Sequence, residues 1–265
     1  MIKVLDHGFV ELVDQMGNDD TVVDAARVSY GKGTKSVSDN RTLLRYLMRH
    51  GHTSPFEMVE FVFHVKLPLF IARQWVRHRT ASLNEVSARY SDMGDVEFYH
   101  PDFRLQSMTN KQCSTDERVS EETMDRLTHL YNDATQKAVH AYREALDAGV
   151  AREVARTILP VSMYTEWIWK CDLHNLLNFI EKRSHPNAQY EIVQYANAIY
   201  DIIKPIVPHT IEAYEDYRKN SIRLTALECD VLKESVVGTV TLIDTNNKRE
   251  QDEWISKRKA LFVRA

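Results

Sequence analysis

The sequence predicts a single α+β domain in which long helices pack around an antiparallel sheet. Three observations favour this class. The 265 residues include only 8 glycines and 7 prolines, which favours long helices and few tight turns. Residues 58–67 and 162–170 alternate apolar and polar side chains, as half-buried strands do. No G-x-G-x-x-G occurs, so the chain lacks the Rossmann fingerprint of a phosphate-binding loop.

Bulk composition restricts the class of protein. Apolar residues make up 43% and charged residues 27% of the chain, which is ordinary for a globular protein. The net charge of −4 gives no overall basic field, so we expect no general nucleic-acid binding. No apolar run approaches the ~18 residues of a membrane helix, so we expect no membrane span. Residues 1–7 carry charge too early for a secretory signal.

The cysteines indicate the compartment. Cys113, Cys171 and Cys229 are odd in number and widely spaced. They predict a reducing, cytoplasmic setting without a disulfide framework, and their spacing fits no metal site.

The N-terminal part predicts one strand, residues 9–13, and two helices. Asp19 and Asp20 can cap the first helix and Asp39 the second, because a carboxylate accepts hydrogen bonds from the free N–H groups of a first turn. Residues 31–36, between the two helices, are expected to be a mobile connection.

The strand over residues 58–67 is followed by a predicted helix over residues 69–76. Pro68 suits the start of this helix, where no N–H group is needed. The helix leads directly into a polar segment, residues 77–90. Residues 94–119 show no regular period and are expected to be irregular.

The second half of the chain is mostly helical. Ser120 starts the longest predicted helix, in which alanines recur at three- and four-residue steps and suggest close helix–helix packing. The remaining elements are a helix over residues 152–159, the strand over 162–170, a helix over 173–183 capped by Asp172, and a helix that restarts at Pro186.

No linker, repeat or low-complexity tract divides residues 1–219, which we interpret as one domain. Residues 220–265 form a C-terminal extension of unknown role. Within it, residues 235–243 could be a strand. Trp254 lies on a charged terminal helix that we expect to pack against the body, with partner binding as the alternative.

The polar segment over residues 77–90 has the composition of a binding site. It holds Arg77, Arg79 and Arg89, with only Leu83 and Val86 as sizeable aliphatic side chains. Arginine grips phosphate because its planar fork donates two parallel hydrogen bonds. The segment indicates a site for a multiply charged anion, with a surface ion-pair cluster as the alternative.

The same segment matches R-H-R-x-x-S-x-N-E-x-S-x-R-Y at every specified position. It thereby resembles the flavin-dependent thymidylate synthases. Residues 52–57 are similar to the H-x-[ST]-P-F-E motif of that family, and residues 152–160 to R-E-x-A-R-x-x-L-P. The resemblance covers roughly residues 8–218. It implies the family's α+β fold and an enzyme that methylates dUMP to dTMP using FAD, NADPH and methylenetetrahydrofolate.

The resemblance also implies a role for individual residues. Arg183 would face the uracil ring and is the expected catalytic residue, since a fixed cation stabilises an anionic pyrimidine. The residues expected to bind the cofactor are His52, Ser54, Arg77, His78, Arg79, Glu85, Asp172, His174 and Asn178. The residues expected to bind dUMP are Gln74, Arg77, Glu85, Val86, Ser87, Ala88, Arg89, Arg156 and Arg183. The family implies a homotetramer with active sites at subunit interfaces.

Other function classes stay open at this point. Ordinary thymidylate synthases activate uracil with a cysteine thiolate, and no cysteine here lies in a convincing site, which favours the flavin route. A nucleotide- or RNA-binding module could use residues 77–89 without catalysis, although the acidic net charge counts against it. A purely helical scaffold would leave the polar segment unexplained.

Overall fold

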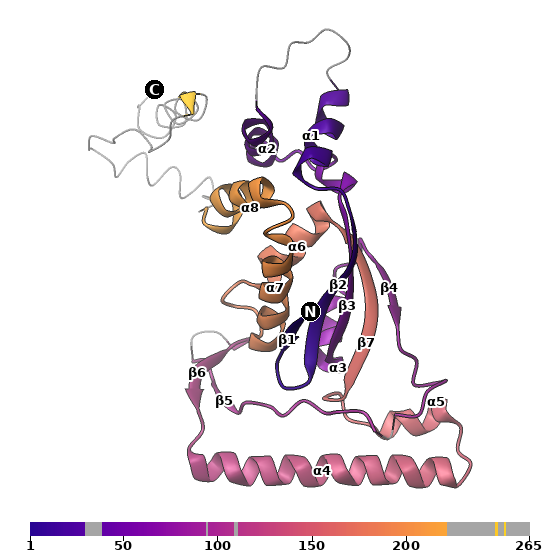
Figure 1. Ribbon diagram of the computed structural model, residues 1–265. Helices are drawn as coiled ribbons and strands as arrows, with labels where there is room; N and C mark the ends of the chain where they lie inside the picture. The colour runs from indigo at the N-terminus through magenta and orange to yellow at the C-terminus, as the bar shows by residue number, and fades with distance from the viewer. Residues whose placement is uncertain (30–38, 94, 109–110, 222–246, 249–251, 253–265) are drawn as a thin grey trace. The chain divides into compact units, whose positions relative to one another are not determined.

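The computed structural model describes residues 1–29, 39–93, 95–108, 111–221, 247–248 and 252 (Figure 1). The chain divides into two compact units, Met1–Lys219 and Asn220–Ala265. Every element with assigned bounds lies in the first unit. The connection expected over residues 31–36 lies outside the described residues, as do the strand and the terminal helix expected in the extension.

A five-stranded antiparallel sheet forms the centre of the first unit. Its strands lie in the order β1 (Ile2–Val4), β2 (Gly8–Met16), β3 (Glu60–Pro68), β7 (Tyr164–Asp172) and β4 (Ser82–Glu85). The alternation predicted for β3 is confirmed, since Phe61, Phe63, Val65 and Leu67 are buried. β4 pairs with β7, so the sheet holds the middle of the polar segment.

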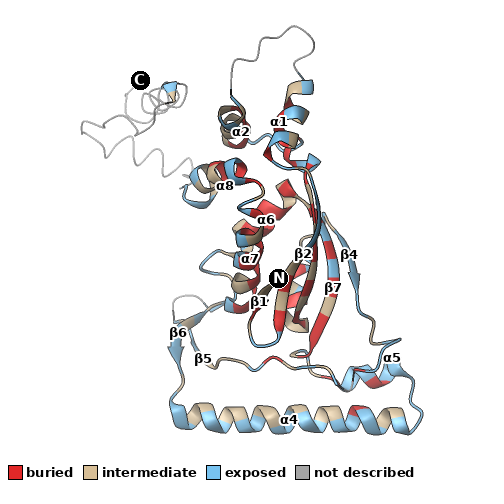
Figure 2. Cartoon of the chain, viewed as in Figure 1, coloured by how far each residue is buried: buried red, intermediate tan, exposed pale blue. Residues whose placement is uncertain are grey.

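Three helices bury their apolar sides against this sheet: α3 (Leu69–Trp75), α6 (Leu173–Arg183) and α7 (Tyr190–Ile203) (Figure 2). An aromatic cluster lies between the helices and the sheet. The Trp75 ring centroid is 4.5 Å from that of Phe179 and 5.2 Å from that of Trp169. Large buried rings contribute strongly to stability, and removing Trp75 would cost about 3–5 kcal/mol.

Three more helices pack together: α1 (Asp19–Val28), α2 (Asn40–Arg49) and α8 (Pro208–Tyr214). Asp39 caps α2 as predicted. The prediction for α1 was wrong, because Asn18 supplies the cap instead of Asp19 or Asp20. Asp19 is buried and ties α1 to α8 by accepting from the Thr210 hydroxyl at 2.6 Å.

Two expectations about residues 94–149 need correction. The segment expected to be irregular contains a small sheet of β5 (Arg104–Gln106) and β6 (Ser114–Arg118). Both strands are short and mostly exposed, so no hydrophobic period marks them in the sequence. The long helix is present as α4 (Glu121–Asp147), capped by Ser120. Its alanine seam is covered at one end only: Ala145 packs against the cluster that contains Ala155 of α5 (Arg152–Ala155), whereas Ala134 and Ala141 are exposed.

Two helix boundaries also differ from the prediction. α5 covers only Arg152–Ala155 and continues as a 3-10 turn, η2 (Arg156–Ile158). α7 begins at Tyr190 instead of Pro186. Residues 185–188 form a turn before it, in which the Ala188 N–H donates to the His185 carbonyl at 2.8 Å.

Candidate active site

A cavity of about 480 Å³ opens where the polar segment leaves the sheet. β4 ends at Glu85, and Val86, Ser87 and Ala88 continue along the cavity wall. η2 contributes Arg156 and Thr157. The other lining residues are Leu69, Met93, Leu159, Met163 and Thr165. The cavity therefore combines apolar walls with a carboxylate, a guanidinium and the hydroxyls of a serine and two threonines.

Hydrogen bonds from β7 fix the carboxylate side of this cavity. The Val86 N–H donates to the Glu166 carbonyl at 2.9 Å. The Thr165 hydroxyl donates to the Glu85 carboxylate at 2.6 Å. Thr165 is buried, so this bond anchors the exposed Glu85 side chain to the interior of the sheet. Glu85 is thus held in one orientation at the cavity wall.

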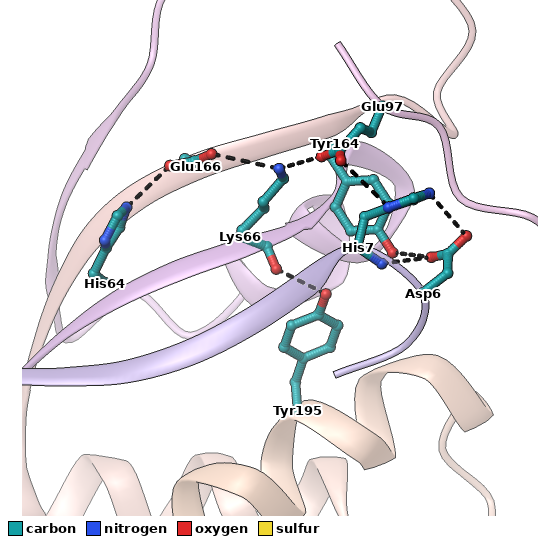
Figure 3. A network of polar contacts seen from close by, with 8 residues as sticks. All are labelled: Asp6, His7, His64, Lys66, Glu97, Tyr164, Glu166 and Tyr195. Carbon is teal, nitrogen blue, oxygen red and sulfur yellow. Dashed lines mark hydrogen bonds and ion pairs between the residues drawn. The ribbon is translucent and has the colours of Figure 1, made fainter. Parts of the chain in front are cut away.

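A polar network fixes the start of β7 (Figure 3). The Tyr164 hydroxyl donates to the Asp6 carboxylate, and Lys66 pairs with Glu97. Burial raises the pKa of Tyr164, so its phenol keeps the proton that it donates. The Tyr164 N–H also donates to the Glu97 carbonyl at 2.9 Å. Because Thr165 follows Tyr164 directly, the network holds the strand that orients the cavity wall.

Two arginines near the cavity differ in their surroundings. Arg156 lines the cavity and is exposed, and its Nε donates to the Glu153 carbonyl at 3.4 Å. Arg89 does not line the cavity; its Nη2 lies 3.1 Å from the Glu153 carboxylate in an exposed ion pair. Such a pair contributes about 0–1 kcal/mol, so a bound anion could readily displace it.

Arg183 lies in a second cluster, at the C-terminal ends of α3 and α6. Its Nη2 donates to the Gln74 carbonyl at 2.8 Å, and its Nε donates to His78 Nε2 at 3.0 Å. Burial and the charge of Arg183 lower the pKa of His78 to about 4, so at neutral pH His78 is an uncharged acceptor. Burial and nearby Arg77 lower the pKa of Arg183, but a guanidinium keeps its proton. The cluster presents a fixed positive charge.

The remaining residues expected to bind the flavin come from two places. His52 and Ser54 are exposed after α2. Asp172 caps α6, and its carboxylate accepts from the backbone N–H three positions on at 2.9 Å and from that residue's amide at 2.8 Å. Further along α6, Asn178 Nδ2 lies 3.1 Å from His174 Nε2. Asp172 is therefore part of the helix end and Asn178 contacts His174, whereas His52 and Ser54 are exposed and open to a ligand.

Arg77 and Arg79 are exposed, and neither has a carboxylate partner among the described residues. Two guanidinium groups without counter-charges suit a ligand with more than one phosphate oxygen. FAD carries a pyrophosphate, so these residues fit that group. Within the described ranges, no three His, Cys, Asp or Glu side chains are placed to hold a metal ion. No helix there combines the length and apolar character needed to cross a membrane.

The structure thus divides the expected residues. Glu85, Val86, Ser87, Ala88 and Arg156 meet at the cavity. Gln74, His78 and Arg183 meet at the second cluster, and none of them lines the cavity. Sequence reasoning missed Thr165. It lies 80 positions from its partner Glu85, and no local pattern could have marked it.

Comparisons with known proteins agree with the family resemblance of the sequence motifs. Residues 11–209 match the family model described as "Thymidylate synthase complementing protein". A protein of Rickettsia prowazekii named flavin-dependent thymidylate synthase is 46% identical over 96% of this chain and 92% of its own length. One of Thermus thermophilus with the same name is 53% identical over 88% of this chain and 84% of its own length. A match over 96% of the chain must reach into residues 220–265, so the Rickettsia protein shares at least part of the extension.

A solved structure is also similar. The UMP/dUMP methylase PolB from Streptomyces cacaoi, bound with 5-Br dUMP, is 33% identical, with a TM-score of 0.72 over 82% of this chain and 99% of that chain. This agreement confirms the α+β fold class. The comparisons support an enzyme and give no support to a nucleotide- or RNA-binding module without catalysis.

Proposed function

Since the chain belongs to the flavin-dependent thymidylate synthase family, and is an enzyme that uses a flavin, we propose that it methylates dUMP to dTMP with FAD, NADPH and methylenetetrahydrofolate. The observation that carries this proposal is the cavity, where residues 85–88 of the polar segment meet Arg156. The proposed setting is the cytoplasm, where the free thiols of Cys113 and Cys171 would stay reduced.

The cavity suits a nucleoside monophosphate. Its volume of about 480 Å³ lies within the usual range for small-molecule sites. Arg156 would bind the phosphate, and Arg89 would join it on leaving its exposed pair with Glu153. The Ser87 hydroxyl would donate a hydrogen bond to the nucleotide. Glu85, oriented by β7, would accept one.

The cofactor would lie along the start of the polar segment. Arg77 and Arg79 would bind the pyrophosphate of FAD, because their charges are uncompensated in the described chain. His52, Ser54, His174 and Asn178 would bind its other polar groups. Bound FAD would supply the hydride that reductive methylation requires.

Arg183 is the proposed catalytic residue. A guanidinium beside a uracil carbonyl favours the anionic pyrimidine and so increases electron density at C5, which must attack the one-carbon donor. The carbonyl of Gln74 and the uncharged ring of His78 fix the guanidinium without neutralising it. Its other N–H groups remain for the substrate.

We further propose a homotetramer in which Arg183 of one subunit completes the cavity of another. Two observations support this. Arg183 and Gln74 do not line the cavity of their own chain. Ala134 and Ala141 of α4 are also exposed in the single chain, although small side chains at helical spacing suit close packing. A site formed between subunits accounts for both.

Reconstitution tests the function. The purified protein should be yellow or take up FAD, and should form dTMP from dUMP only when NADPH and methylenetetrahydrofolate are both present.

Arg156→Ala should raise the KM for dUMP by about 10- to 100-fold, the scale of a charge-assisted bond, with parent-like FAD content. Arg152→Ala, which changes an exposed arginine outside the cavity lining, is the matched control. A colourless protein that takes up no FAD would overturn the proposal.

A further inference from the structure

Arg218 connects the end of the first unit to the proposed flavin site. It lies in η3 (Glu215–Lys219), a π-helical turn of a kind that is rare and often found at functional sites. Its side chain is 14% exposed, and its Nε donates to the Glu181 carboxylate at 2.8 Å. Its Nη2 donates to Asn178 Oδ1, while Asn178 Nδ2 lies 3.1 Å from His174 Nε2. A line of hydrogen bonds therefore runs from Arg218 to two residues assigned to FAD.

The order of donors and acceptors along this line of hydrogen bonds is fixed, because an arginine side chain contains donors only. The Asn178 carbonyl must face Arg218, so the Asn178 NH₂ group must face His174. An NH₂ group donates, and therefore His174 Nε2 must accept. The ring proton of His174 then lies on Nδ1, which has no partner among the described residues. That N–H is left to donate to a ligand.

We propose that Arg218 is a positioning residue of the flavin site, which fixes the Asn178 amide and, through it, the tautomer of His174. This inference rests on the proposed assignment of Asn178 and His174 to FAD. An acceptor atom of the cofactor, such as a hydroxyl or phosphate oxygen, then meets an Nδ1–H donor that is already oriented. Orienting a binding group before the ligand arrives lowers the entropic cost of binding.

A purely structural role for Arg218 would be to tie η3 to α6 through Glu181. Arg45 provides the matched control for that role. Its side chain is 15% exposed, and it pairs with Glu212 and with Asp216 of η3 at 2.7 Å each. Replacing Arg45 therefore removes two ion pairs of an arginine of similar burial, one of them to η3, without touching Asn178.

The test combines a spectroscopic and a binding measurement. In enzyme labelled with ¹⁵N-histidine and loaded with FAD, NMR should show His174 with Nε2 unprotonated and Nδ1 protonated; loss of signals in His174→Gln identifies the ring. In Arg218→Gln both tautomers should appear, because a glutamine can accept as well as donate. The dissociation constant for FAD should rise about tenfold, the upper scale of one hydrogen bond. Arg218→Lys, which has donors only, should keep the parent tautomer.

Arg45→Gln should lower the unfolding midpoint about as much as Arg218→Gln, yet keep the parent tautomer and FAD affinity. A folded Arg218→Gln variant with the parent tautomer and FAD affinity would overturn the inference. A protonated Nε2 in the parent enzyme would also overturn it, and that measurement needs no Arg218 variant to fold. If the parent protein itself bound no FAD, the proposed function would be wrong. A titration of the parent with FAD detects this case separately from any effect of the Arg218 variants.

Discussion

At the scale of single residues, the contacts of Arg183 distinguish a helix-capping role from a catalytic role. Arg183 is the last residue of α6, where an arginine commonly bonds the free carbonyls of its own helix. Its Nη2 instead bonds the Gln74 carbonyl at the end of α3, and its Nε bonds His78. A backbone carbonyl and a side chain from the end of α3 and the residues just after it therefore hold this charge in place. Such preorganisation is expected of a group that stabilises a developing anion.

Replacing Arg183 should therefore stop methylation while preserving the fold. Arg183→Ala should stay folded, bind FAD and oxidise NADPH, but its rate of dTMP formation should fall at least ~100-fold. Arg183→Lys should recover little, because a point charge does not reproduce the planar fork. Lys182→Ala, a change at an exposed neighbour, is the control and should stay near the parent rate. A rate within about tenfold of the parent in Arg183→Ala would return this residue to a helix-end role.

His78 should give the folded protein a specific sensitivity to acid. Its pKa is about 4 in the folded chain, against an ordinary value of 6.5. The unfolded chain therefore binds the extra proton first as the pH falls below 6.5, and stability is lost progressively down to about pH 4. Between pH 7 and 4.5, the parent should lose roughly 1–3 kcal/mol more unfolding free energy than His78→Gln, allowing for partial exposure.

The His78→Gln variant keeps a side-chain acceptor for Arg183 and removes only the titration. Urea unfolding of both proteins across this pH range provides the measurement. Parallel pH profiles would show that His78 is not held uncharged in the folded chain.

At the scale of elements, Asp172 is the N-cap of α6 and is also one of the residues that the family resemblance assigns to the cofactor. Asp172→Ala should lower the unfolding free energy by about 1 kcal/mol, because the α6 cap is lost. If Asp172 also serves the cofactor, FAD affinity should fall as well. Asp39→Ala removes the cap of α2 and should cost similar stability with unchanged FAD affinity. Equal FAD affinity in the two variants would leave Asp172 with the cap role alone.

At the scale of the whole molecule, the separation of Arg183 from the cavity predicts complementation between subunits. Arg183→Ala and Arg156→Ala should each be nearly inactive at limiting dUMP. When the two are unfolded together and refolded as a mixture, sites that pair an intact Arg183 from one chain with an intact Arg156 from another should reappear. Random assembly would restore roughly a quarter of the sites.

Each variant refolded alone is the control for this experiment, and light scattering should show a tetramer throughout. If the mixture stayed as inactive as its components, both arginines would belong to one chain within each site. An active, FAD-bound monomer would exclude the proposed assembly altogether.

The elements that depend on local rules could be predicted from the residues alone. The period of two in β3, the Asp172 cap of α6 and the Ser120 cap of α4 are properties of neighbouring residues, so they can be read without a structure. The polar segment over residues 77–90 likewise carries its own recognisable pattern, and with it the family. Local rules were insufficient at α1, because Asn18 and Asp19 are both able to cap a helix. In the folded chain Asn18 caps α1, and Asp19 instead accepts a hydrogen bond from Thr210 of α8.

The grouping of the candidate site residues, in contrast, depends on how distant parts of the chain pack together. Arg183 and Gln74 are 109 positions apart, and Thr165 and Glu85 are 80 positions apart, so no periodicity in the sequence links them. The low pKa of His78 arises from burial and from a guanidinium that the chain brings back from α6. The order of donors and acceptors along Arg218, Asn178 and His174 likewise depends on η3 lying beside α6 in the folded chain. Hydrogen bonds and charge interactions depend on the distance between side chains in space. For residues far apart in the sequence, that distance is set by the packing of the folded chain.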